Sequence, residues 1–164
     1  MRNKSSAIIL SLAALALAAQ TTAAEEGSAG HAGHLTVMPD QVTWGEVGSM
    51  PPGAKAAVLE GDPSKDQDFT MRIYFPADYT IPLHTHPAVE RVTVLEGTLY
   101  FGVGDTFDRD AAQALPPGTL AVMDVGVPMY GFTKDEPVVI QLNGTGPWGI
   151  DYVNQADDPR RPAE

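Results

Sequence analysis

TIPLHTHPAVERVTVLEGTLYFGV, residues 80–103, is the stretch that best indicates the fold. Short runs at 92–95 and 98–103 alternate with a period of two, which predicts β-strands with one buried face. Between them lies Leu95-Glu96-Gly97-Thr98, and Gly97 can adopt the positive φ that a tight turn requires. The stretch therefore predicts two strands joined as a tight hairpin.

Outward from this stretch, similar short runs recur between Gly, Pro and Asp, and they predict further strands at 35–38, 56–59, 69–75, 120–123 and 138–142. In residues 69–75 every second side chain is large and apolar, which predicts a strand with one buried face. Only residues 108–115 resemble a helix, ended by Pro116 and Pro117. The pattern predicts an all-β, single-domain jelly roll or closed barrel.

The two ends of the chain differ from this pattern. Arg2 and Lys4 precede an apolar run at 7–18 and small residues at 22–24, which predicts a signal peptide over residues 1–24. Residues 25–34 are predicted to be flexible, 35–154 to form the barrel, and 155–164 to be a loose tail or a strap. We therefore expect a periplasmic or secreted protein with no membrane insertion after signal removal.

The composition excludes several functions. The formal net charge is -11 and Lys and Arg are scattered, so nucleic acid is not an expected partner. Cysteine is absent, which excludes disulfides and thiolate chemistry. Neither a nucleophile elbow nor a phosphate-binding glycine loop is present.

Three side chains suited to a metal lie within seven residues: His84, His86 and Glu90. Residues two apart on a strand share a face, so both imidazoles can point to one position, and Glu90 follows after a bend at Pro87. Two imidazoles and one carboxylate form a facial triad for a divalent first-row metal. The alternative is that they are exposed polar residues on an edge strand.

These residues carry a resemblance to the cupin superfamily. His84-x-His86-x3-Glu90-x6-Gly97 is similar to its first motif, and Gly118-x5-Asp124-x-Gly126-x2-Met129 follows the spacing of its second. Residues 146–154, GPWGIDYVN, resemble the end of small exported cupins. The resemblance implies a small barrel with a metal inside, held by two His, one Glu and usually a third His, and it implies a homodimer.

The sequence departs from the cupin pattern at four positions. Asp78, Asp124 and Thr133 replace residues of turns and barrel corners, whereas Met129 stands where the last metal-binding His is expected. Three interpretations follow. The site holds Mn, Fe or Ni with three protein ligands, it holds Cu with Met129 as a soft fourth ligand, or it has lost its metal and kept an apolar pocket that Met129 fills.

Weaker candidates complete the set. Gln141 and Asn143 share a face of one strand, and with Tyr100 they are candidates to orient a small-molecule substrate. His31 and His34 lie in a Gly- and Ala-rich segment that cannot preorganise a metal clip. Two functions remain: a metal-dependent oxygenase or isomerase acting on a small organic molecule, or a non-catalytic module that stores or senses a metal or small ligand.

Overall fold

The structure is a computed structural model that describes residues 33–161. The predicted signal peptide, His31 and residues 162–164 lie outside this part. Within it the chain forms eleven strands and two short 3₁₀ helices, with no α-helix. In chain order these are η1 (Pro39–Gln41), β1 (Gly45–Glu46), β2 (Lys55–Glu60), β3 (Asp68–Phe75), β4 (Thr80–Thr85), β5 (Glu90–Glu96), β6 (Leu99–Val103), β7 (Gln113–Leu115), β8 (Leu120–Met123), β9 (Met129–Phe132), β10 (Val138–Thr145), β11 (Asp151–Tyr152) and η2 (Gln155–Asp157).

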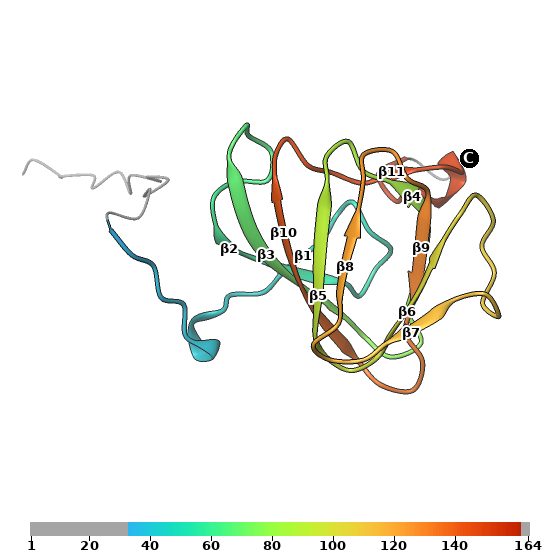
Figure 1. The fold of residues 1–164 in the computed structure, drawn as a ribbon, viewed down its shortest axis with the longest axis horizontal. Helices are drawn as coiled ribbons and strands as arrows, with labels where there is room; N and C mark the ends of the chain where they lie inside the picture. The colour runs from blue at the N-terminus through green and yellow to red at the C-terminus, as the bar shows by residue number, and fades with distance from the viewer. Residues whose placement is uncertain (1–32, 162–164) are drawn as a thin grey trace, which may run out of the picture.

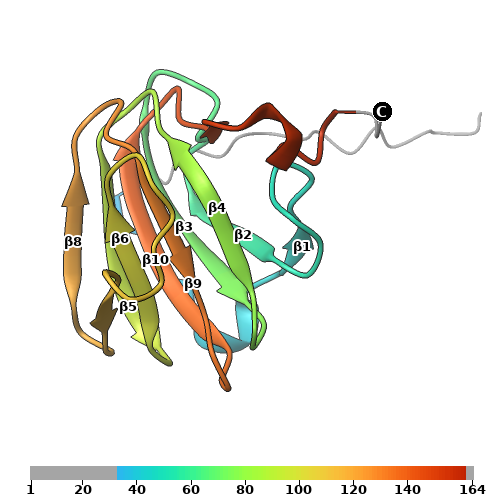
Figure 2. The same cartoon turned by 90° about the vertical axis from the view of Figure 1, so that its right-hand side faces the viewer.

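The strands form two antiparallel sheets that face each other (Figures 1 and 2). The six-stranded sheet has the order β1-β2-β3-β10-β5-β8, and the five-stranded sheet has the order β11-β4-β9-β6-β7. Some neighbouring strands are far apart in sequence, as β3 and β10 show by pairing over eight residues. This confirms the predicted all-β jelly roll.

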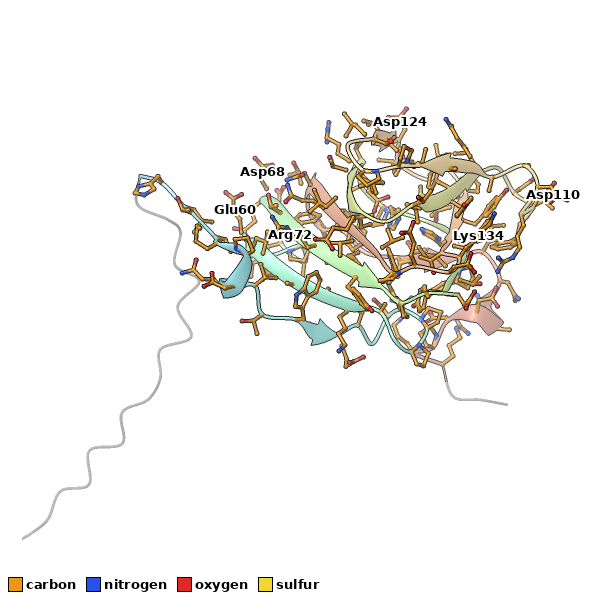
Figure 3. All side chains as sticks on the ribbon, turned by 90° about the horizontal axis from the view of Figure 1, so that it is seen from below. Glu60, Asp68, Arg72, Asp110, Asp124 and Lys134 are labelled. Atoms are coloured by element: carbon orange, nitrogen blue, oxygen red, sulfur yellow. The ribbon has the colours of Figure 1, made fainter. Side chains whose placement is uncertain are left out.

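The core lies between the two sheets. The alternation predicted for residues 69–75 is confirmed, because Phe69, Met71, Ile73 and Phe75 are all buried on the inner face of β3. Burying such a side chain contributes about 1.5–3 kcal/mol, so this strand is a major part of the core. Glu90 is a buried acidic residue, whereas Figure 3 shows Asp110 and Lys134 at one end of the molecule, away from Glu60 and Asp68.

The helix predicted at 108–115 is wrong. Asp108 Oδ1 accepts hydrogen bonds from the backbone N–H groups of Asp110 and Ala111, which forms a turn in place of a helical start. Residues 113–115 then form β7, where Leu115 is buried opposite Leu99. A local side-chain bond and pairing with β6 together outcompete the helix.

The strand predicted at 35–38 is also absent. Leu35 and Met38 are 47% and 53% exposed, and no strand of residues 33–161 pairs with this segment. A strand needs a hydrogen-bonding partner, so alternation alone does not create one.

The turn at Gly97 is confirmed, but the hairpin is wrong. Gly97 has φ +70°, and a Cβ there would lie 2.2 Å from the carbonyl oxygen of Pro137. The strands that it joins do not pair, because β5 is bonded to β10 and β8 while β6 is bonded to β7 and β9. Gly97 is therefore a corner at which the chain passes from one sheet to the other.

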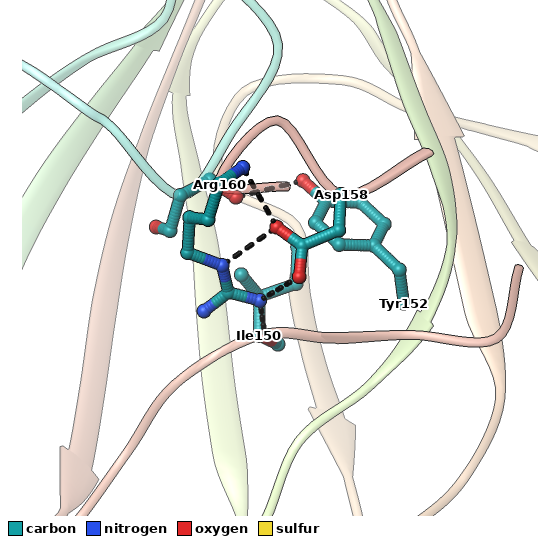
Figure 4. Close-up of polar contacts among 5 residues, drawn as sticks. Ile150, Tyr152, Asp158 and Arg160 are labelled. Carbon is teal, nitrogen blue, oxygen red and sulfur yellow. Dashed lines mark hydrogen bonds and ion pairs between the residues drawn. The ribbon is translucent and has the colours of Figure 1, made fainter. Parts of the chain in front are cut away.

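The C-terminal segment folds back over one end of the barrel. β11 pairs with β4, and the Tyr152 hydroxyl donates to the carbonyl oxygen of Ser49 over 2.9 Å. Arg160 Nη2 donates to the carbonyl oxygen of Ile150, and its guanidinium pairs with Asp158 (Figure 4). Residues 150–160 thus form a strap tied to both the sheet and the loop after β1.

Candidate metal centre

An irregularity in β4 decides which way its histidines point. Ile81 pairs with Gly131 and His84 with Met129, so three steps along β4 oppose two along β9. Such a bulge reverses the inward and outward alternation beyond it, and Pro82 is tolerated there because it need not donate to the ladder. Ile81, His84 and His86 are consequently all buried on the inner side.

Both imidazoles are fixed by backbone carbonyls. His84 Nδ1 lies 2.7 Å from the carbonyl oxygen of Pro82, and His86 Nδ1 lies 2.6 Å from that of Gly149. A carbonyl oxygen only accepts, so Nδ1 carries the hydrogen in each ring and Nε2 keeps its lone pair. The ring centroids are 4.8 Å apart, so the two rings are close neighbours.

Burial keeps these rings neutral. It lowers the pKa of His84 to about 4, with the nearby His86 adding to the effect, and it lowers the pKa of His86. A neutral imidazole with a free Nε2 is the form that binds a metal. The hydrogen bond from Nδ1 to a carbonyl is the usual way in which a metal-binding ring is oriented.

Glu90 is the first residue of β5 and is only 5% exposed. Its Oε1 atom lies 3.5 Å from His86 Nε2, which is long for a hydrogen bond. Burial raises the pKa of Glu90 to about 8. A carboxyl group with such a pKa can give up or accept a proton near neutral pH.

These three residues and Met129 line one cavity of about 60 Å³. A cavity needs about 10–15 Å³ to hold one water, so this cavity has room for a few waters or a small ligand group. Its remaining walls are mostly apolar, including Ile73, Val92, Leu99, Phe101 and Ile140.

Trp148 is a cavity residue that the sequence did not reveal. Its ring stacks on His86 with centroids 4.8 Å apart and planes 18° apart. Its Nε1–H is buried and has no hydrogen-bond partner among residues 33–161. The only sequence signal was its place in the GPWG stretch, which assigns it no role.

The residues fit a metal by donor type, although the donors do not yet converge. Within residues 33–161 no three His, Asp or Glu side chains are already grouped as a metal site. The structure nevertheless places two imidazoles with free Nε2 atoms and a buried carboxyl at one cavity, and these donors suit a first-row metal. Side-chain movement is needed to bring the three onto one ion.

The three weaker candidates for substrate binding do not line the cavity. Tyr100 stacks on Phe132 outside the main core, with Lys134 Nζ 3.9 Å from its ring, whereas Leu99 and Phe101 line the cavity. Gln141 Oε1 accepts from Arg72 Nε, and Asn143 Nδ2 donates to Thr70 Oγ1. These two face away from the cavity because their neighbours Ile140 and Leu142 are the buried ones.

His34 is exposed and His31 lies outside the described residues, so a clip between them has no described geometry.

Solved structures share this architecture. No protein-family model and no curated protein sequence matches the chain. The polyketide cyclase RemF from Streptomyces resistomycificus is 18% identical, with a TM-score of 0.62 over 76% of this chain and 89% of that one. The DMSP lyase DddQ from Ruegeria pomeroyi DSS-3 is 20% identical, with a TM-score of 0.57 over 74% and 72%.

An RmlC-like cupin from Shewanella frigidimarina NCIMB 400 is 15% identical, with a TM-score of 0.55 over 71% of this chain and 94% of that one. Two antiparallel sheets around a small buried pocket define a jelly-roll barrel. Together with these neighbours, they show that the chain has the cupin fold.

Proposed function

We propose that this protein binds one first-row metal ion through His84, His86 and Glu90 and acts there on a small organic molecule. The observation that carries the proposal is that both imidazoles present a free Nε2 at the cavity that also contains the Glu90 carboxyl. Mn, Fe, Ni and Cu are the candidate metals.

The chain's own residues would have defined roles at this centre. The carbonyl groups of Pro82 and Gly149 hold the rings in the metal-binding tautomer. Glu90, protonated at neutral pH in the metal-free cavity, releases its proton as a cation enters. The apolar walls exclude bulk water and favour a substrate of modest size. A bound metal would supply Lewis acidity or would activate O₂.

Two neighbours in fold support a catalytic role, because a polyketide cyclase and a DMSP lyase are both enzymes. An oxygenase or isomerase activity is the reaction class that we propose. Fold alone does not assign a reaction, so the support comes from the cavity and its donors.

A non-catalytic binding module is the second candidate. Met129 favours it, because a thioether in place of a nitrogen ligand weakens a site for Mn or Fe. Metal content, followed by O₂ uptake with small carbonyl compounds and phenols, separates the two functions. An enzyme turns over at least one class, whereas a binding module retains metal and turns over none.

Export and dimerisation complete the proposal. The sequence of residues 1–24 supports export to the periplasm or secretion, and mass spectrometry of the native protein should show a chain that begins near Glu25. An intact Met1 in a cytoplasmic fraction would contradict export. Within residues 33–161 no helix is long and apolar enough to cross a membrane. A homodimer is testable by light scattering.

The metal site is tested by the double substitution His84→Ala with His86→Ala. We expect it to abolish bound metal while far-UV circular dichroism stays β-rich, because neither ring belongs to the apolar core. The melting temperature should also stop responding to chelator, since a bound ion stabilises only the folded state. The control is His34→Ala, an exposed residue that should leave metal content unchanged. A wild-type protein that binds no added Mn²⁺, Fe²⁺, Ni²⁺ or copper ion would refute the proposal.

A further inference from the structure

Methionine side chains gather around the candidate metal centre. Met50, Met71 and Met129 line the same cavity as the two histidines, from the loop after β1, from β3 and from β9. A fourth, Met123 on β8, is buried directly opposite Glu90 in the pairing of β5 with β8. Since the whole chain has six methionines, this is a marked concentration of sulfur at one site.

Met129 is the methionine best placed to meet a bound ion. It pairs directly with His84 across β4 and β9, and both side chains are buried on the inner side. Side chains that oppose each other in an antiparallel pair have Cβ atoms about 4.5–5.5 Å apart. The unbranched methionine side chain is flexible enough to turn its sulfur toward an ion at the neighbouring ring.

The donor set distinguishes between metals. Thioether sulfur is a soft ligand that suits Cu⁺, whereas Mn²⁺ prefers oxygen donors. Imidazole accepts copper as well as other first-row ions. The apolar walls also favour Cu⁺ over a divalent ion. Burying charge in an apolar cavity is costly, and Cu⁺ carries one positive charge whereas a divalent ion carries two.

We propose that this centre is selective for Cu⁺ and that Met129 sets the selectivity, with His84 and His86 as the nitrogen ligands. The inference rests on the proposed metal site and assigns its metal. Its competitor is a purely space-filling Met129, which the 1% exposure of this side chain also allows. Leucine separates the two roles because it preserves the volume and removes the sulfur.

The experiment is an anaerobic competition titration of Cu⁺ between the protein and a chromophoric Cu⁺ chelator, beside a calorimetric titration of Mn²⁺. Wild type should bind one Cu⁺ per chain and prefer it to Mn²⁺. Met129→Leu should weaken Cu⁺ binding by about tenfold or more, in the range seen when a metal site loses a supporting group, and leave Mn²⁺ unchanged. The matched control is Met38→Leu, at a residue that is 53% exposed and outside the cavity, which should behave as wild type.

X-ray absorption at the copper edge gives an independent readout. A sulfur neighbour of copper should be present in wild type and in Met38→Leu, and it should be lost in Met129→Leu. In the opposite direction, Met129→His should tighten Mn²⁺ and Ni²⁺ binding by supplying a third nitrogen. Unfolding curves verify that each variant is folded, since Met→Leu exchanges usually cost less than about 1.5 kcal/mol.

Two outcomes overturn the inference while leaving the metal site intact. One is a Met129→Leu variant that binds Cu⁺ as tightly as wild type. The other is a wild type that binds Mn²⁺ or Fe²⁺ through His84 and His86 in preference to Cu⁺. If wild type binds neither Cu⁺ nor any divalent ion, the proposed function itself fails.

Discussion

The two sides of β9 are packed in different ways. On one side, Tyr130 and Phe132 are buried outside the main core, in an aromatic cluster with Phe107 and Tyr100. Arg109 lies over Phe132 with its Cζ atom 4.3 Å from the ring centroid, and the Tyr130 hydroxyl donates to a backbone carbonyl. The Arg109 guanidinium and the Tyr130 hydroxyl therefore both have a partner.

The other side of β9 faces the cavity. There Met129 lies opposite His84, and the buried Glu90 carboxyl lies 3.5 Å from His86 Nε2. The buried Trp148 Nε1–H on this side has no hydrogen-bond partner among residues 33–161, and a buried polar group without a partner lowers stability unless something binds it. The comparison teaches that one short strand separates a region that stabilises the fold from a region suited to a ligand.

The largest expected effect is on the aromatic side. Phe132→Ala should lower the free energy of unfolding by about 3–5 kcal/mol, because it leaves a cavity in a closely packed cluster. Metal affinity per folded molecule should not change. Urea unfolding followed by circular dichroism gives the free energy of unfolding, and calorimetry gives the metal affinity. Phe107→Ala is the control and should cost less, since Phe107 is 36% exposed. A large loss of metal affinity in Phe132→Ala would show that the two sides are coupled.

A smaller effect is expected at Gly102. A Cβ on this residue would lie 2.0 Å from Cζ of the Tyr130 ring, so Gly102→Ala should cost about 1–3 kcal/mol through overpacking. Gly149→Ala is the matched control near the cavity, where an added Cβ meets nothing within 4 Å. Thermal unfolding of both variants tests the difference. Equal losses would mean that the aromatic side is no more tightly packed than the Gly149 loop.

The third prediction concerns the pH dependence of stability at Glu90. Burial raises the pKa of this carboxyl from 4.5 to about 8, so the folded state binds its proton more tightly than the unfolded state does. Its contribution to the stability of metal-free protein is therefore complete below about pH 4.5 and is lost as the pH rises to about 8. Glu90→Gln has no such proton to lose. In chelator, its stability relative to wild type should rise with pH over this window, by about 1.4 kcal/mol for each unit by which folding raises the pKa of Glu90. A constant difference from pH 5 to pH 9 would show that Glu90 is solvated.

Much of the fold could be predicted from local pattern. The alternation in residues 69–75 identified the buried face of β3, and residues 120–123 match β8. Three cavity residues belong to one short motif: His84, His86 and Glu90. Their spacing in the sequence was enough to predict that they are neighbours.

The rest depends on pairing between distant segments. The bulge in β4 arises from its register with β9, so no local pattern shows that His84 and His86 face inward together with Ile81. Trp148 reaches His86 only through the fold of the C-terminal segment. Tyr100 lies outside the cavity that Leu99 and Phe101 line, and local alternation did not select this face because both faces of the strand carry apolar residues.

The most direct test of the metal centre is long-range ¹H–¹⁵N NMR of the histidine rings, which is practical because the chain has four histidines. At pH 7 without metal, His84 and His86 should both be neutral, with hydrogen on Nδ1 and a free Nε2, as their bonds to the Pro82 and Gly149 carbonyls require. Added Cu⁺ should shift the Nε2 resonances of these two rings and leave His34 unchanged. Hydrogen on Nε2 of either ring, or rings unaffected by saturating Cu⁺ and by diamagnetic Zn²⁺, would contradict the account.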